Sequence, residues 1–488
     1  MHFDMSQFDS YREDNRREVK KAKGGLPLSL WETYSAFANC YGGVIILGVK
    51  ENHDGSWNMT GLESASKLKK DFWNVINDKK KVSINLLMDK DVKVYEENGK
   101  VILVIRVPRA KREQKPVYIN GNIFDGTFRR NWEGDYHCDR SEVLAMLRDQ
   151  PEETADMKIL EDMSLDVFHE ETIHAYRNRH IAFRREHVWE RLEDNEYLER
   201  IGAAKISAKD GKLHPTAAGL LMFGEEYKIL YEFPEYFLDY REVLDPTIRW
   251  TDRLQSSSGD WTGNLFDFFF RVYGKLVKDL KIPFKLEGIT RIDDTPVHKA
   301  LREALANCLV NTDFYFQRGI VIRKDVNSIT MENPGNIRTG KEQMLKGGIS
   351  DPRNKALMKM FNLIGIGERA GSGVPDIYSV WKQQGWEPPE VIEEYGPDRT
   401  ILKLSFIKSA DKKVLIKSAD KKTVTKKTEQ QLEDILGKMD FNKEYKTSEI
   451  AKFIDVKETR ARTLLKELVK QGKIKAIGKN KGRRYIRK

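Results

Sequence analysis

Two glutamates near the start of the chain, Glu13 and Glu18, lie among arginines and lysines in the segment YREDNRREVKKAK. Carboxylates beside cations suit a cleft where Mg²⁺ or Mn²⁺ faces a phosphate, and equally a solvated network of ion pairs. Lys20 follows Glu18 by two residues, so in a strand the two side chains share one face, either towards a phosphate or as an exposed ion pair. Glu13 and Glu18 are five residues apart, so their convergence requires a break between them.

The next residues predict the elements that would position these carboxylates. Leu30, Tyr34, Phe37 and Tyr41 recur at helical spacing, and Gly42-Gly43 ends that pattern. Residues 44–49 form a short apolar run typical of a buried strand. Further along, the periodicity predicts a helix over 65–80, strands over 82–87, 92–95 and 101–107, and a closing helix over 141–149.

The pattern Glu13-x4-Glu18-x-Lys20, followed by Ser-Ala-Phe-Ala-Asn-x-x-Gly-Gly and Gly-Val-x-Glu, resembles the AlbA-type nucleic-acid-binding domain of the Schlafen family. Nuclease members of that family cut RNA, frequently tRNA, with two glutamates, a downstream aspartate and a metal ion, whereas other members only bind. The resemblance implies that Glu13 and Glu18 are catalytic metal ligands and that Lys20 belongs to the same site. Glu51, or with less support Asp54, would be the third acid, although the family has an aspartate there.

Tyr118, Arg129 and Arg130 lie in a segment that resembles the end of the same domain, where strand residues face the nucleic acid. Cations combined with an aromatic ring suit single-stranded or looped RNA. The alternative is a tyrosine packed in a sheet beside solvated arginines.

A second set of motifs begins with Glu303 and Asn307, which share one helix face at positions i and i+4. Glycine turns follow at Asn333-Pro334-Gly335 and at Glu368-x-x-Gly371-Ser372-Gly373, with Arg353 between them. This order resembles the GHKL ATPase fold in the RecG-like segment that accompanies Schlafen-type domains.

That second resemblance implies an ATP site. Asn307 would hold a Mg²⁺ ion on the phosphates, Glu303 would be the candidate base, and Gly335, Gly371 and Gly373 would let the backbone approach the nucleotide. The resemblance also implies that Arg353 is one of the nucleotide-binding residues. Asn333 stands where the family has an aspartate that accepts the adenine amino group. The alternative is a nucleotide fold retained only as a dimerisation scaffold.

The C-terminal tail is strongly basic. Residues 401–488 hold 26 Lys and Arg against 11 Asp and Glu, while the whole chain has a net charge of +10. Residues 407–427 contain Ile-Lys-Ser-Ala-Asp-Lys-Lys twice and read as a solvated linker. The remainder predicts three helices and a hairpin, the order of a winged helix that binds DNA or RNA or, as the alternative, another protein. The expected nucleic-acid contacts are Arg460, Arg462, Lys466, Lys479, Lys481, Arg483 and Arg484.

Composition and length complete the expected organisation. The three cysteines are widely separated, which excludes an ordinary cysteine zinc site or a disulfide framework, and no run of 18 apolar residues exists. We therefore expect a cytoplasmic α/β (α+β) protein with no membrane segment, forming a homo-oligomer. The predicted parts are a Schlafen AlbA-type domain at 1–150, a helical winged-helix-like connector at 151–235, a GHKL-like ATP-binding sandwich at 236–406, the linker at 407–427 and the winged helix at 428–488.

Two functional hypotheses follow. The first is a metal-dependent endoribonuclease with nucleotide binding in its GHKL-like domain, a layout that would suit an antiviral defence or stress-response effector. The second is a non-enzymatic DNA-binding transcriptional regulator that oligomerises and senses a nucleotide. The sequence lacks the G-x4-G-K-[ST] phosphate loop, which argues against a helicase motor.

Overall fold

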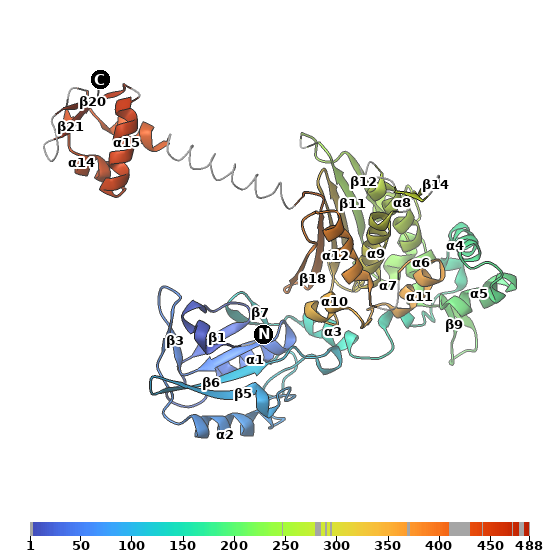
Figure 1. The fold of residues 1–488 in the computed structure, drawn as a ribbon. Helices are drawn as coiled ribbons and strands as arrows, with labels where there is room; N and C mark the ends of the chain where they lie inside the picture. The colour runs from blue at the N-terminus through green and yellow to red at the C-terminus, as the bar shows by residue number, and fades with distance from the viewer. Residues whose placement is uncertain are drawn as a thin grey trace. The chain divides into compact units, whose positions relative to one another are not determined.

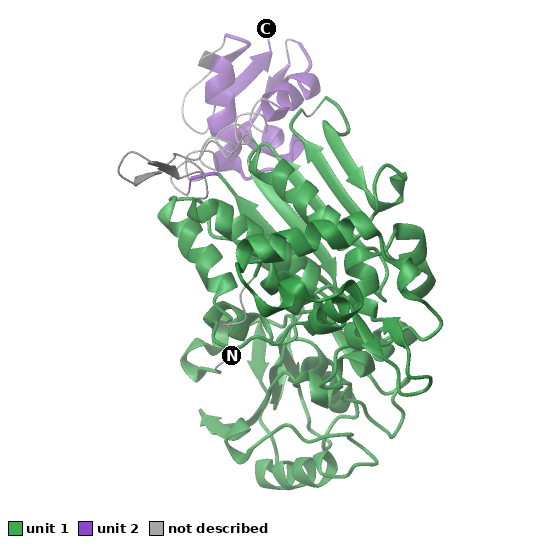
Figure 2. Cartoon of the chain, turned by 90° about the vertical axis from the view of Figure 1, so that its right-hand side faces the viewer, with its two compact units in different colours: residues 1–406 green, residues 407–488 purple. Residues whose placement is uncertain are grey.

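The computed structural model describes residues 3–245, 247–278, 285–287, 290–292, 295–367, 371–408, 430–441, 443–470, 472–477 and 483–487. The chain divides into two compact units, Met1–Phe406 and Ile407–Lys488, drawn in green and purple in Figure 2. No helix in the described ranges is long and apolar enough to cross a lipid bilayer.

Unit 1 begins with a four-stranded sheet of order β1-β2-β6-β5, in which β1 and β2 are parallel and the other pairs antiparallel. Every residue of β2 is buried, as expected for a strand with neighbours on both sides. The strands are β1 (Arg17–Lys20), β2 (Gly43–Leu47), β5 (Val92–Glu97) and β6 (Lys100–Val107). The accompanying elements are α1 (Ser29–Asn39), α2 (Ala65–Ile76), α3 (Arg140–Asp149) and the hairpins β3 (Val49–Glu51) with β4 (Trp57–Met59) and β7 (Phe128–Asn131) with β8 (Gly134–His137).

Both faces of this sheet are covered. Alternate strand residues such as Ile45 and Ile105 pack with α1 and α2, while their neighbours Val44 and Val104 pack with aromatic residues of the N-terminal segment. Asn39 joins α1 to β7 because its Nδ2 donates to the carbonyls of Val117 and Phe128 at 2.8 and 3.0 Å. These contacts hold β7 against the C-terminal end of α1.

The strand predicted over 82–87 is wrong. The structure has only a single bridge there, between Val82 and Ile119. The hydroxyl of Tyr34 donates to the carbonyl of Ile84 and accepts the N–H of Leu86, both near 3 Å. A buried side chain therefore satisfies the backbone groups that a neighbouring strand would have bonded.

The middle of unit 1 is mainly helical and shares one hydrophobic core with the second sheet. Its short antiparallel hairpin pairs Ala204 with Pro215. The elements are α4 (Glu170–Phe183), α5 (Asp194–Ile201), β9 (Ala204–Ile206), β10 (Leu213–Pro215), α6 (Ala217–Phe223) and α7 (Glu226–Glu232).

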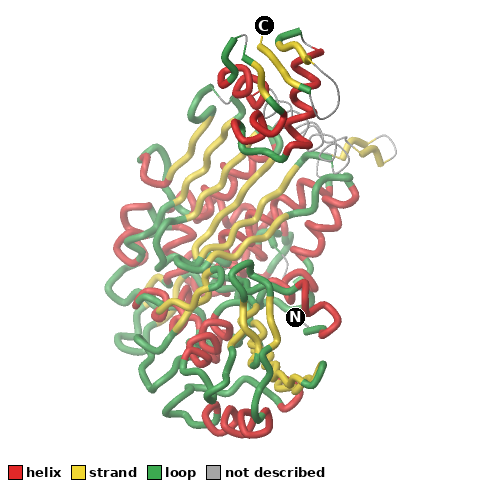
Figure 3. Tube along the Cα trace, turned by 90° about the vertical axis from the view of Figure 1, so that its left-hand side faces the viewer, coloured by secondary structure: helices red, strands yellow, loops and turns green. Residues whose placement is uncertain are grey.

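The second sheet has six strands in the order β12-β11-β15-β16-β18-β17, with only β11 and β15 parallel. Helices pack behind it, as seen in the view onto the strands in Figure 3, so this part has two layers. The strands are β11 (Leu238–Val243), β12 (Asp252–Gln255), β15 (Ile320–Asp325), β16 (Ser328–Pro334), β17 (Glu390–Glu394) and β18 (Arg399–Ser405). The helices are α8 (Leu265–Val277), α9 (Pro296–Val310), α10 (Lys341–Lys346), α11 (Lys355–Leu363) and α12 (Gly373–Gln383), and β13 (Lys285–Glu287) pairs with β14 (Thr290–Ile292).

Unit 2 contains helical residues 430–438, two further helices and a three-stranded sheet of order β19-β21-β20. Leu464, Leu465 and Leu468 of the helix at 458–470 are buried, as the spacing predicts. The elements are β19 (Glu444–Tyr445), α14 (Thr447–Phe453), α15 (Glu458–Lys470), β20 (Ile474–Ile477) and β21 (Arg484–Arg487). Figure 1 labels the elements of both units.

Candidate functional site

A tight turn ahead of β1 brings Glu13 back towards the strand. Asp14 and Arg17 form an isolated bridge, and the carboxylate of Asp14 accepts the N–H of Arg16 at 2.7 Å. Glu13 Oε1 then accepts the backbone N–H of Val19 at 2.8 Å. This turn is the break in the chain that the five-residue spacing of Glu13 and Glu18 requires.

Cations occupy both carboxylate oxygens of Glu18. Its Oε1 lies 2.9 Å from Lys20 Nζ, and its Oε2 lies 2.9 Å from Arg130 Nη2. The side chains of Glu18 and Lys20 are only 13% and 11% exposed, so this ion pair is not the solvated surface pair of the alternative reading. Arg130 continues the chain of charges to Asp135 on β8 at 2.9 Å. Asp135 lies in a polar segment without a recognisable motif, so the sequence alone did not indicate it.

Three glutamates lie close enough to repel one another. Burial, together with the negative charges of Glu18 and Glu51, raises the pKa of Glu13 to about 7. Burial also raises the pKa of Glu51, assisted by the charges of Glu133 and Glu18. The site therefore brings Glu13, Glu18 and Glu51 into one electrostatic group, which would be stabilised by added positive charge.

The fit of these acids to a divalent cation is partial. Carboxylate oxygens are the donors that Mg²⁺ and Mn²⁺ prefer, and the mutual repulsion of the three glutamates favours a cation. However, the described residues include no group of three histidine, cysteine, aspartate or glutamate side chains arranged to hold a metal ion. Glu13, Glu18 and Glu51 therefore do not form the preassembled metal-binding site that was expected. Glu18 is held by Lys20 and Arg130 instead, so binding would require the glutamates to rearrange.

The expected nucleic-acid contacts of this domain differ in accessibility. Arg130 cannot contact a phosphate as placed, because it is 1% exposed and its guanidinium faces Glu18 and Asp135. Arg129 is half-buried and donates to the carbonyl of Tyr395 at 3.2 Å. Tyr118 is half-buried, with its backbone N–H bonded to Ser83. Arg130 thus positions Glu18 and is not a direct nucleic-acid contact.

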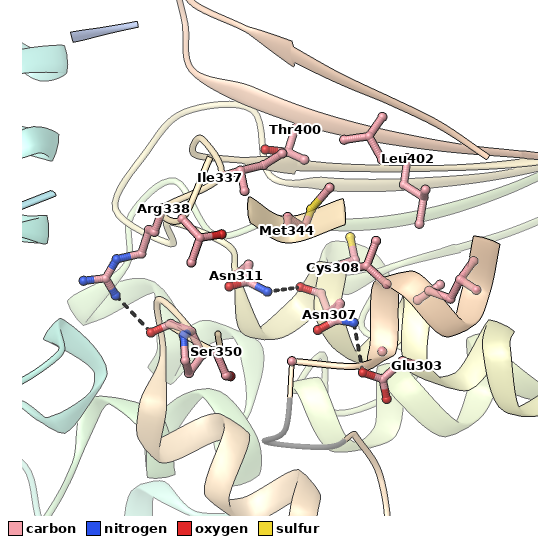
Figure 4. A pocket seen from close by; sticks show the side chains of 18 of the residues that line it. Glu303, Asn307, Cys308, Asn311, Ile337, Arg338, Met344, Ser350, Thr400 and Leu402 are labelled. Atoms are coloured by element: carbon pink, nitrogen blue, oxygen red, sulfur yellow. Dashed lines mark hydrogen bonds between the residues drawn. The ribbon is translucent and has the colours of Figure 1, made fainter. Parts of the chain in front are cut away.

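A cavity of about 150 Å³ lies between α9, α12 and the second sheet. Glu303 and Asn307 line it from α9, and Asn307 Nδ2 donates to Glu303 Oε1 at 3.0 Å, as Figure 4 shows. Apolar side chains including Met344, Ile377 and Leu402 form much of its remaining wall. An apolar hollow with a few convergent polar groups is the usual form of a small-molecule site.

Asn333 and Thr400 face each other across β16 and β18 and line the same cavity. The amide nitrogen of Asn333 donates to the carbonyl of Pro334 at 3.2 Å, and within the described ranges no donor bonds its Oδ1. That oxygen can accept a ligand N–H. Thr400, whose hydroxyl donates to the carbonyl of Gly335 at 2.8 Å, was missed because a single threonine in a strand carries no recognisable motif.

Two further residues of the expected nucleotide set, Gly371 and Gly373, also line the cavity. A Cβ atom on Gly373 would overlap the carboxylate of Glu303, which would then have to move out of the cavity wall. Gly371 has φ +68°, a conformation that favours glycine. Glu368, which belongs to the same motif, lies outside the described residues.

Arg353 and Gly335 do not line this cavity. Arg353 is 7% exposed, forms an ion pair with Asp149 at the end of α3 and donates to the carbonyls of Asn311 and Asn336 at 3.1 and 3.0 Å. Gly335, with φ +100°, packs directly against that guanidinium. The nucleotide contacts expected of both residues therefore lie outside this cavity, because Arg353 joins the first sheet domain to loops beside it.

In unit 2, α15 presents exposed cations. Arg462 and Lys466 are exposed, whereas Arg460 is half-buried and bonds Gln431 at 2.9 Å. Arg483 is exposed and Arg484 is half-buried at the start of β21. Lys479 and Lys481 lie outside the described residues.

Three family models match separate parts of the chain. Residues 10–138 match "Schlafen, AlbA_2", residues 144–239 match a domain of unknown function, and residues 318–400 match "Putative ATP-dependent DNA helicase recG C-terminal". The carboxylate site falls within the first match. Strands β15, β16 and β17 of the second sheet, together with Asn333, fall within the third.

Solved structures are similar at lower levels, and no curated protein matches. A Corynebacterium diphtheriae protein is 16% identical with a TM-score of 0.40, covering 97% of this chain and 95% of its own. The N-terminal domain of a "Putative ATP-dependent DNA Helicase RecG-related Protein" from Nitrosomonas europaea is 28% identical with a TM-score of 0.22. That match covers 27% of this chain and 89% of the other.

Proposed function

We propose that this chain is a nucleotide-controlled protein that binds RNA and cleaves it with a divalent cation. The proposal is supported by its Schlafen AlbA_2 domain and its RecG C-terminal-like domain. The observation that carries the cleavage is the turn that returns Glu13 to β1, where its carboxylate bonds the N–H of Val19 and interacts with the charges of Glu18 and Glu51. Perturbed carboxylates gathered in one place are typical of catalytic sites.

The residues divide the work as follows. Glu13 and Glu51, joined by Glu18 once it leaves Lys20, would hold Mg²⁺ or Mn²⁺, which polarises a phosphodiester and activates water when bound. Lys20 would then be released to neutralise the phosphate. Arg130 keeps Glu18 oriented through its bond at 2.9 Å and is itself held by Asp135.

For the second domain we propose a GHKL-type sandwich that binds ATP. Asn333 Oδ1 would accept the adenine amino group beside Thr400, and Asn307 would face the Mg²⁺ on the phosphates, with Glu303 as the base if ATP is hydrolysed. For unit 2 we propose a winged helix that contacts nucleic acid through Arg462 and Lys466, supported by its exposed cations.

The test is cleavage of a labelled tRNA pool by the full-length protein with Mn²⁺ or Mg²⁺, with and without ATP. Glu18→Gln is preferred to Glu18→Ala because it keeps a hydrogen-bond acceptor for the buried Arg130. Glu97→Gln, an exposed acid on β5 at the opposite sheet edge, is the matched control. We expect metal-dependent cleavage that falls at least about 100-fold in Glu18→Gln and is unchanged in Glu97→Gln.

A second function, a DNA-binding regulator that senses a nucleotide and oligomerises, is favoured by one observation. Both oxygens of Glu18 are already neutralised by Lys20 and Arg130, the arrangement of a structural network. RNA bound without cleavage under every metal condition, together with tight duplex DNA binding by unit 2, would support this function over the nuclease.

A further inference from the structure

A basic hollow lies where the end of the first sheet meets α10, outside the carboxylate group and the nucleotide cavity. Its volume is about 380 Å³. Arg16, Tyr41 and Arg106 line it from the first sheet domain, and residues 339–343 with Lys346 line it from the second sheet domain. Figure 1 shows α10 at the junction of these two parts of unit 1.

Cations outnumber acids around the hollow, with five lysines and arginines against Glu342 and Glu393. Two of the cations are committed to the fold: Arg109 pairs with Glu393 at 3.1 Å, and Lys341 donates to the carbonyl of Val391. Within the described residues, the side chains of Arg106 and Lys346 make no ion pair or hydrogen bond, and both are exposed. Unpaired cations on facing walls favour an anionic occupant.

Arg16 has only a weak partner. Its Nη1 lies 3.4 Å from Glu342 Oε1, and the Glu342 side chain is 82% exposed. Exposed ion pairs of this kind contribute little free energy, so a phosphate can replace the glutamate with little loss. The Arg16 guanidinium also lies 5.7 Å from the ring centre of Tyr41, so a cation and an aromatic ring stand together on this wall.

The position of the hollow indicates what it holds. Arg16 lies in the turn that leads into β1, two residues before Glu18. A nucleic-acid strand bound in the hollow would therefore extend towards the carboxylates. Duplexes are read by elements that protrude into a groove, whereas a recessed wall of cations and an aromatic ring suits one strand.

We propose that this hollow binds the sugar-phosphate backbone of a single RNA strand beside the carboxylates. The proposal rests on the proposed function, because it supplies the path of the RNA whose cleavage is assigned to Glu13, Glu18 and Glu51. Arg106 and Lys346 contact phosphates, and Arg16 exchanges Glu342 for a phosphate.

The test measures binding of a fluorescein-labelled oligouridylate to the full-length protein by anisotropy over a range of salt concentrations. Arg106→Gln with Lys346→Gln should lower the slope of log K against log salt by about 1.4, at ~0.7 per lost phosphate contact. Glu342→Gln should tighten binding about two- to fivefold, since it frees Arg16. Glu342 is exposed, so this gain of binding cannot be attributed to misfolding.

Matched controls carry the same charge changes elsewhere. Lys67→Gln with Lys70→Gln removes two exposed lysines of α2, and Glu97→Gln removes one exposed acid of β5. Equal salt slopes in wild type and the Arg106/Lys346 variant would overturn the proposal. So would a Glu342→Gln effect no larger than that of Glu97→Gln, or tighter binding of oligodeoxythymidylate than of oligouridylate.

Photocrosslinking of 4-thiouridine RNA separates this hollow from unit 2. Crosslinks to peptides containing Tyr41 or Arg106 are expected, whereas crosslinks confined to residues 430–487 would overturn the proposal. If metal-dependent cleavage requires Glu18 but is unchanged in the Arg106/Lys346 variant, only the proposal for the hollow is overturned. A wild-type protein that neither binds nor cuts RNA would overturn both.

Discussion

At the scale of single residues, Glu13 gives a pH-dependent prediction. Its pKa is about 7 in the folded protein and 4.5 as its ordinary value, so the native state binds the extra proton between these values. Stability therefore falls as pH rises through that window, and the full cost is present above about pH 7. Glu13→Gln should raise the free energy of unfolding by about 1 kcal/mol at pH 8, allowing for solvent screening, and have no effect near pH 4.

Thermal melts at pH 4, 6 and 8 check this, with Glu97→Gln as the control for charge alone. The same measurement reports on metal binding, because Mn²⁺ that binds the glutamates should raise the melting temperature of wild type at pH 8 more than that of Glu13→Gln. A stabilisation by Glu13→Gln that is equal at all three pH values would contradict the assigned pKa.

Residue types predicted which side chains could do chemistry but not which charges neutralise one another. Arg130 and Arg353 read as phosphate ligands because isolated arginines suit phosphate. The structure buries Arg130 against Glu18, 112 residues away, and Arg353 against Asp149, 204 residues away. Pairings over such separations leave no local pattern in one sequence.

At the scale of elements, the sequence predicted the helices and strands that depend only on neighbouring residues. The helix, the Gly42-Gly43 stop and the strand after it need only periodicity and a glycine with φ +69°. The segment 82–87 has an equally apolar pattern, yet it is no strand because the hydroxyl of Tyr34 satisfies its backbone. That competing bond comes from another element, so periodicity cannot reveal it.

The short helix α10 is a wall shared by two sites. Met344 faces the nucleotide cavity, Lys346 faces the basic hollow, and Thr339 lines both. Filling one site should therefore change affinity at the other by the same factor. We expect a non-hydrolysable ATP analogue to change oligouridylate affinity about fivefold or more, and Met344→Ala to reduce that factor.

Anisotropy titrations with and without the analogue check this coupling, and a competition assay checks that Met344→Ala still binds the analogue. Ile392→Ala, a partly exposed change on β17, is the control for a side chain outside both cavities. Identical RNA affinities with and without bound analogue would exclude α10 as a link.

At the scale of the whole molecule, charge is divided between the two units. Residues 401–488 carry a net charge of +15 in a chain whose total is +10, so the preceding residues are slightly acidic. A net negative charge repels nucleic acid at long range, whereas a basic unit attracts it. Unit 2 should therefore provide most of the salt-dependent, sequence-independent affinity, while unit 1 acts on what has been captured.

Arg462 and Lys466 test this division because both are exposed at i and i+4 on α15. If each neutralises one phosphate of duplex DNA, Arg462→Gln with Lys466→Gln lowers the slope of log K against log salt by about 1.8, at ~0.9 per contact. The Lys67/Lys70 variant removes the same charge from unit 1 and should leave the slope within experimental error. Equal losses from both double variants would mean that net charge alone attracts the DNA, and that α15 forms no docking face.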